Sequence, residues 1–150
     1  MPEVRETIEI EAPPDAVWEL CMDPDRLGDW VTAHSHSSFD DPDGTLDEGD
    51  SFKQVLCLGG QPVDVHWTLE RSERPSLAEW DADGPRDSGA KVRYVLESAN
   101  GGTRFRYEND FDLPGGPVRL IAGRIAGAPA RHAARKSLKK LKALVESESA

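Results

Sequence analysis

The apolar pattern of this chain changes its period once, at the Leu-Pro-Gly-Gly-Pro segment of residues 113–117. Before that segment, residues 103–113 alternate one by one between an aromatic or polar side and a charged side, which predicts a two-faced strand. After it, apolar residues follow helical spacing, first at Val118, Ile121, Ala122 and Ile125, then at Ala134, Leu138, Leu141 and Val145. The chain therefore predicts a sheet that is complete before one long C-terminal helix begins.

Strand-like segments occupy most of the chain ahead of this point. Residues 4–11 alternate with β-branched side chains on one side, which Glu6 interrupts. Asn100-Gly101-Gly102 is a hairpin signal that leads into the last strand. A short helix is expected at residues 16–21, and a second short helix or a turn at residues 26–30. Further strand-like stretches, separated by turn residues, cover residues 51–58, 63–71, 77–82 and 90–97.

This order of elements favours an α+β fold, because the strands are grouped together and the helices are set apart from them. A curved antiparallel sheet can wrap around a C-terminal helix along its length. A ligand would then lie between the sheet and the helix. Gly127 and Pro129 interrupt the helical pattern, so we expect a kink or a break near residues 127–129.

Charge is distributed unevenly along the 150 residues, whose formal net charge is −10. Residues 1–113 hold 26 acidic and 10 basic residues, whereas residues 114–150 hold 2 acidic and 8 basic ones. The overall excess of acid argues against sequence-independent binding to nucleic acid, because phosphates repel it. The simplest interpretation of the basic segment is that it packs on the acidic body.

Location and membrane association can be inferred from composition. No apolar run approaches the roughly 18 residues of a membrane span, so stable membrane insertion is not expected. The first residues show no secretory signal, and two cysteines, Cys21 and Cys57, fit free thiols in a reducing compartment. A cytoplasmic protein is therefore expected, and both thiols are expected to be inert in the core because they lie in apolar patterns.

Three segments together resemble the START-like superfamily, often called SRPBCC. The first is the strand that ends in Ala12-Pro13-Pro14-Asp15-Ala16-Val17-Trp18, with Asp23-Pro24 and Trp30 after it; the second is residues 46–52, and the third is residues 112–117. The chain looks most like the bacterial subgroup called polyketide cyclase/dehydrase-like or CoxG-like. The resemblance implies a single helix-grip domain over residues 1–150, with a cavity for apolar or amphipathic small molecules.

The apolar parity of the strands predicts which side chains line that cavity. Several are aromatic, and tyrosine, tryptophan and asparagine would add polar groups to an apolar wall. Asn109 is informative because a buried amide needs a partner, which a ligand can supply. For any single apolar member, simple core packing is the favoured interpretation, because most buried apolar residues only pack. The predicted lining residues are Trp30, Trp67, Leu69, Tyr94, Phe105, Tyr107, Asn109, Ile121 and Ile125.

No metal or cofactor site is predicted. His34 and His36 are spaced for one strand face, but no third ligand accompanies them, so they are interpreted as surface residues on a loop. The acidic residues 40–50 lack the first and last ligands of an EF-hand and are interpreted as a solvated loop. The paired glycines are turns rather than a phosphate-binding loop, since no lysine follows them.

Three functions remain open at this point. The primary hypothesis is a binding protein that holds an apolar or aromatic small molecule, lipid- or polyketide-like, between sheet and helix. The first alternative is a cyclase- or dehydratase-type enzyme, in which Tyr94, Tyr107 or Asn109 would polarise a carbonyl group. The second alternative is an accessory protein that binds a protein partner through the basic C-terminal helix.

Overall fold

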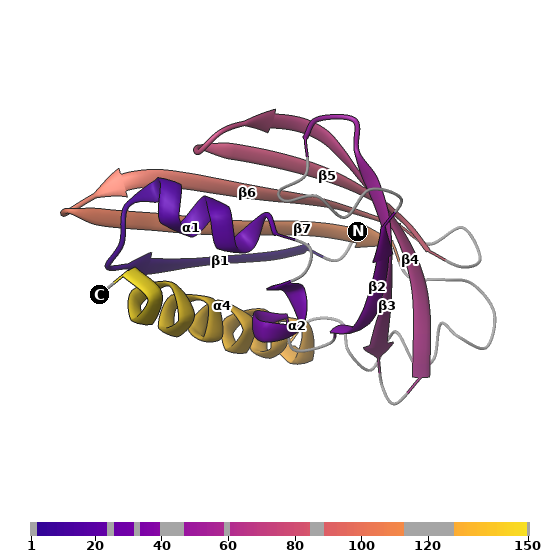
Figure 1. Cartoon of the computed structure of the whole chain (residues 1–150). Coiled ribbons are helices and arrows are strands. Elements are labelled where there is room, and N and C mark those ends of the chain that lie inside the picture. Colours follow the sequence, from indigo (N-terminus) through magenta and orange to yellow (C-terminus); the bar gives the residue numbers. More distant parts are fainter. Residues whose placement is uncertain are drawn as a thin grey trace.

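The computed structural model describes residues 3–23, 26–31, 34–39, 47–58, 61–84, 89–112 and 128–149. Figure 1 shows a long curved sheet with the helices on its concave side. The elements in chain order are β1 (Glu3–Ile10), α1 (Pro14–Cys21), α2 (Leu27–Trp30), β2 (His34–Phe39), β3 (Ser51–Leu58), β4 (Gln61–Glu73), β5 (Leu77–Asp83), β6 (Gly89–Ala99), β7 (Gly102–Asp112) and α4 (Ala128–Ser149).

Seven strands form one antiparallel sheet in the order β1-β7-β6-β5-β4-β3-β2 within the described residues. The first strand pairs with the last, so the chain returns to its starting edge before α4 begins. The predicted α+β helix-grip fold is confirmed. The hairpin is confirmed as well, since Asn100 and Gly101 take positive φ angles of 51° and 81° between β6 and β7.

One strand was missed by the sequence prediction. The interpretation of His34 and His36 as loop residues is wrong, because both belong to β2, the edge strand that pairs with β3. The segment His-Ser-His-Ser-Ser-Phe has no apolar alternation, so its strand pattern cannot be recognised from the side chains alone. Its backbone extends because β3 offers an unpaired edge to it.

The helix α4 packs along β1 and also touches α1 and α2 (Figure 1). Leu138, Leu141 and Val145 are buried on this side, as the helical spacing predicts. Glu6, which interrupts the apolar side of β1, is accommodated by an ion pair, since Arg135 Nε lies 3.0 Å from its Oε1. The predicted irregularity at Pro129 coincides with the first turn of α4, where proline is tolerated; residues 118–127 lie outside the described residues.

Candidate ligand-binding face

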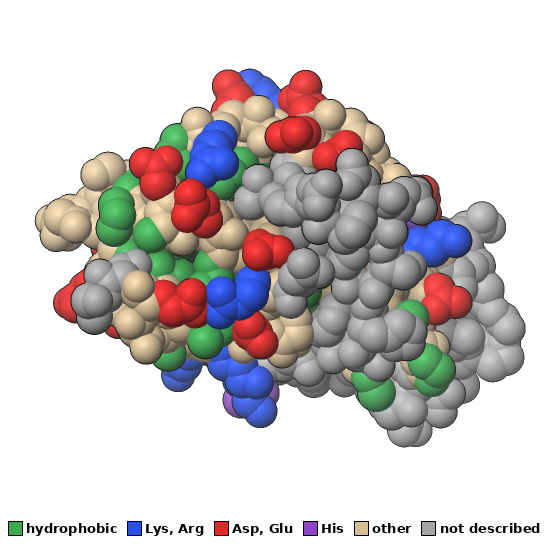
Figure 2. Space-filling view, in the orientation of Figure 1, with side chains coloured by type: hydrophobic (Ala, Val, Ile, Leu, Met, Phe, Trp, Pro, Cys, Tyr) green, Lys and Arg blue, Asp and Glu red, His purple; other side chains and the backbone are tan. Residues whose placement is uncertain are grey.

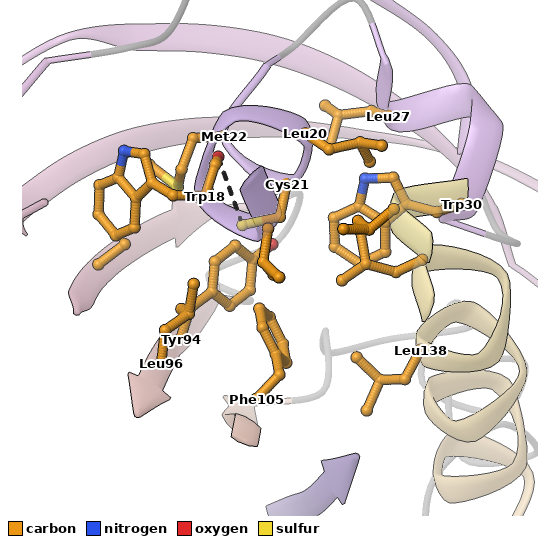
Figure 3. Packing of buried hydrophobic residues seen from close by; sticks show 14 of the residues in the cluster. Trp18, Leu20, Cys21, Met22, Leu27, Trp30, Tyr94, Leu96, Phe105 and Leu138 are labelled. Carbon is orange, nitrogen blue, oxygen red and sulfur yellow. Dashed lines mark hydrogen bonds between the residues drawn. The ribbon is translucent and has the colours of Figure 1, made fainter. Parts of the chain in front are cut away.

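The concave side of the sheet carries six of the nine side chains that the sequence analysis assigned to a cavity. Leu69 and Phe105 are fully buried, and Tyr94 is 8% exposed. Trp30, delivered by α2, is 3% exposed and lies above the strands near Leu20, Leu27 and α4 (Figure 3). Trp67, Tyr107 and Asn109 are half-buried. Ile121 and Ile125 lie outside the described residues.

Seven rings on this side form a continuous series of edge or tilted contacts, which we call the aromatic cluster: Trp30, Phe52, Trp67, Trp80, Tyr94, Phe105 and Tyr107. Tyr94 is its hub, with ring centroids 6.2 Å from Trp30, 6.5 Å from Trp80, 5.4 Å from Phe105 and 6.1 Å from Tyr107. Such geometries are the favourable ones for aromatic pairs, so the rings hold one another in place. The cluster spans β3 to β7 and presents a largely apolar surface.

Two members of the cluster, Phe52 and Trp80, were not assigned to this face from sequence. Trp80 is 5% exposed and its ring lies 6.2 Å from Trp67 and 5.9 Å from Phe52. Along β5, Ala78, Trp80 and Ala82 are all buried, and this alternation was available in the sequence. Leu77, an apolar residue on the opposite parity, left the inner side of β5 uncertain, although Glu79 and Asp81 share that parity.

Hydrogen bonds orient two polar side chains of this face, Trp67 and Asn109. Trp67 donates through Nε1 to Oε1 of Gln54 at 2.8 Å, which joins β4 to β3. Asn109 donates through Nδ2 to the hydroxyl oxygen of Tyr107 at 3.0 Å, along β7. The indole N–H of Trp67 is therefore already used by the protein.

Three buried side-chain polar atoms have no hydrogen-bond partner among the described residues, and they belong to two members of the aromatic cluster and to Asn109, which is bonded to a third member. They are Nε1 of Trp30, Nε1 of Trp80 and Oδ1 of Asn109. Buried polar groups in proteins are nearly always paired, and an unpaired one costs about 1–3 kcal/mol. Two donors and one acceptor therefore lack a hydrogen-bond partner within the described part of the chain.

Tyrosine supplies both titratable groups of the aromatic cluster. Burial raises the pKa of Tyr94 well above its ordinary value of 10.0. Burial likewise raises the pKa of Tyr107, and the hydrogen bond from Asn109 opposes that rise. Both hydroxyls therefore stay protonated at neutral pH, where they can donate or accept hydrogen bonds but do not act as bases.

The predictions for the two cysteines have different outcomes. Cys21 is buried on α1, and burial raises its pKa, as expected of an inert thiol. The prediction for Cys57 is wrong, because its side chain is exposed on β3.

Within the described ranges, no three His, Cys, Asp or Glu side chains gather as a metal site. The loop of residues 40–46 and the side chains of His34 and His36 lie outside the described residues.

The whole chain is similar to known proteins. A family model described as "Polyketide cyclase / dehydrase and lipid transport" matches residues 1–146. A relative named "Toxin Rv0910", from Mycobacterium tuberculosis, is 27% identical over 139 residues, covering 92% of this chain and 94% of that protein.

Solved structures show the same fold. The protein TTHA0849 from Thermus thermophilus superposes with a TM-score of 0.75 at 18% identity, covering 99% of this chain and 100% of that one. CV1439 from Chromobacterium violaceum gives a TM-score of 0.73 at 17% identity, covering 97% and 99% of the two chains. None of the helices in the described residues is both long and apolar enough to cross a membrane.

Proposed function

Because the chain belongs to the polyketide cyclase/dehydrase and lipid transport family, we propose that it binds an apolar or aromatic small molecule between its sheet and α4. The observation that carries this proposal is the set of three buried polar atoms that have no hydrogen-bond partner among the described residues. They lie on Trp30, Trp80 and Asn109, beside or within a cluster of rings that is otherwise apolar. The expected cytoplasmic location belongs to the same proposal.

The unpartnered atoms indicate the kind of molecule that fits. Two indole N–H groups would donate to oxygen acceptors such as carbonyl or ether groups. Oδ1 of Asn109 would accept from a hydroxyl group of the ligand. The rings around them favour a flat, mostly hydrocarbon body. A lipid- or polyketide-like molecule that carries a few oxygens combines these properties.

Binding without turnover is the form of this function that we favour. General acid–base catalysis needs a group whose pKa lies near the working pH. The pKa values of both tyrosines in the cluster are raised, which moves them further from neutral pH. In the cyclase or dehydratase alternative, Tyr94, Tyr107 or Asn109 would hydrogen-bond a substrate carbonyl and stabilise charge that develops on it. Conversion of the recovered ligand by the purified protein would favour that alternative.

Native mass spectrometry of the protein purified from its own host tests the proposal directly. We expect a retained small molecule, whose occupancy falls in the Trp30→Phe and Trp80→Phe variants because each loses one donor. Trp18→Phe is the matched control, since it shortens a buried indole of α1 that is not among the unpartnered donors. Absence of any retained molecule, together with no binding of added lipids by the wild type, would contradict the proposal. Equal binding by all four proteins would contradict the assignment of the two indole donors.

The name of the Mycobacterium tuberculosis relative favours a second candidate function. That relative, 27% identical over 92% of this chain, is called a toxin, so this chain would inhibit growth when it is overproduced. Controlled expression in its host, with growth rate as the readout, tests this candidate. Normal growth at high protein levels would exclude it. If growth is inhibited, the Trp30→Phe variant shows whether the effect needs the concave face.

A further inference from the structure

Most of the exposed side chains of α4 are basic. Residues 113–145 contain no Asp or Glu and eight Lys or Arg, in a chain whose net charge is −10. Figure 2 shows Lys, Arg and His side chains gathered at the lower edge of the molecule, beneath α4. We define the α4 basic face as the exposed residues Arg131, His132, Arg135, Lys136, Lys139 and Lys140.

This arrangement disfavours the helix that carries it. Cations recur four residues apart, as in the pairs Arg131–Arg135 and Lys136–Lys140, and like charges at that spacing repel. The cations also lie toward the N-terminal part of α4, whereas its acids, Glu146 and Glu148, lie at the C-terminal end. Both placements oppose the helix dipole. Local helix stability therefore does not explain the α4 basic face.

Folding of the rest of the chain does not explain it either. On the outer side of the sheet, cations pair with acids of neighbouring strands, such as Lys91 with Asp81 at 2.7 Å and Arg104 with Glu9 at 3.0 Å. On the α4 basic face, Arg135 has such a partner in Glu6. Among the described residues, Arg131, Lys136, Lys139 and Lys140 have no ion-pair partner.

We propose that the α4 basic face is a docking surface for an acidic segment of another protein. Residues 131–140 rise about 1.5 Å each along the helix, so the cations extend over roughly 14 Å. A short run of Asp and Glu residues, extended or helical, can place several carboxylates along this length. Such a partner would relieve the repulsion between neighbouring cations and supply the missing ion pairs.

The borders of the face favour an acidic protein segment over larger polyanions. Glu9 and Glu11 are exposed beside α4, since Lys142 Nζ donates to the backbone oxygen of Glu9 and the Glu11 backbone N–H donates to Glu146. Glu146 and Glu148 border the C-terminal end. A nucleic acid or an anionic bilayer that extended beyond the helix would meet these carboxylates. The exposed apolar positions of α4, Ala133 and Ala143, are also too small to stack on bases or insert among lipids.

Fluorescence anisotropy with a labelled poly-glutamate peptide at physiological ionic strength tests this proposal. The variant Lys136→Gln/Lys139→Gln/Lys140→Gln removes three unpaired cations. The matched control, Lys53→Gln/Arg74→Gln/Arg106→Gln, removes the same net charge from exposed positions outside α4. We expect the peptide to bind the wild type and the control within about twofold of each other, and the α4 variant about tenfold more weakly.

Three further measurements separate docking from other causes. The melting temperature of the α4 variant is expected to equal or exceed that of the wild type, because like-charge contacts are removed. Equal weakening in both triple variants would overturn the proposal, because binding would then follow net charge alone. It would also be overturned if oligothymidylate or phosphatidylglycerol vesicles bound this face more tightly than the peptide. Self-association that is lost only in the α4 variant would overturn it too, since the occupant would be a second copy.

Discussion

Asn109 donates through its side-chain nitrogen to the hydroxyl of Tyr107, 3.0 Å away, while its own side-chain oxygen is buried without a partner among the described residues. This hydrogen bond to a residue of the same strand fixes the orientation of the Asn109 amide, whose oxygen Oδ1 stays buried. The polar part of the concave face is therefore organised by the protein before any ligand arrives. This preorganisation reduces the entropy that binding would otherwise cost.

The hydrogen bond between these two residues predicts a difference between the two tyrosines of the chain. Tyr107→Phe removes the acceptor of the Asn109 amide, so we expect a loss of about 1 kcal/mol in the free energy of unfolding. Tyr94→Phe is the matched control, because the Tyr94 hydroxyl has no hydrogen-bond partner in the described part of the chain. Urea denaturation of the three proteins measures the difference. A larger loss in Tyr94→Phe would contradict this assignment.

Both tyrosines also predict how stability depends on alkaline pH. Burial raises both pKa values above 10.0, so the folded protein holds these protons at a pH where the unfolded chain releases them. The contribution of the two tyrosines to the free energy of unfolding is therefore fully present below about pH 10. It decreases as the pH rises through that value toward the folded-state pKa values. Absorbance of tyrosinate during alkaline titration checks this prediction. Ionisation of one tyrosine near its ordinary pKa, with the fold intact, would show that its ring reaches water.

Where burial alternates along a strand, the sequence was sufficient to predict the fold. On β6, Val92, Tyr94 and Leu96 are buried while Lys91 and Arg93 are exposed, and that alternation is visible in the residue types. The same holds for β7 and for the buried side of α4. Because hydrophobic burial determines these elements, the residue types of the chain are enough to identify them.

The wrong or incomplete predictions concern strand residues whose type does not indicate whether they face the inner or the outer side of the sheet. Cys57 lies in the apolar run Val55-Leu56-Cys57-Leu58, so no parity could be assigned, yet it shares the outward parity of Lys53. The aromatic cluster was only partly predicted, because the contacts of Trp80 depend on the pairing of β5 with β4. The unpartnered donors could not be predicted, since a missing hydrogen bond is a property of the packed interior.

The opposite environments of the two cysteines predict selective modification. Cys57 is exposed, whereas Cys21 is buried and its pKa is raised by burial. We expect Ellman's reagent to modify one thiol per native chain, and the Cys57→Ser variant to react only after denaturation in urea. Rapid modification of native Cys57→Ser would mean that α1 opens and exposes Cys21 on the timescale of the reaction.

The turn between β6 and β7 predicts the final comparison, between two adjacent glycines. A Cβ atom on Gly102 would lie 2.3 Å from the backbone oxygen of Ile10, which belongs to the strand paired with β7. Gly102→Ala must therefore displace β1, and we expect a loss of about 2–3 kcal/mol in the free energy of unfolding. Gly101→Ala places a Cβ atom in open space but keeps a positive φ of 81°, which costs about 1 kcal/mol. Thermal and urea denaturation should rank Gly102→Ala as the less stable protein. The reverse order would mean that the edge pairing of β1 with β7 yields more easily than the turn itself.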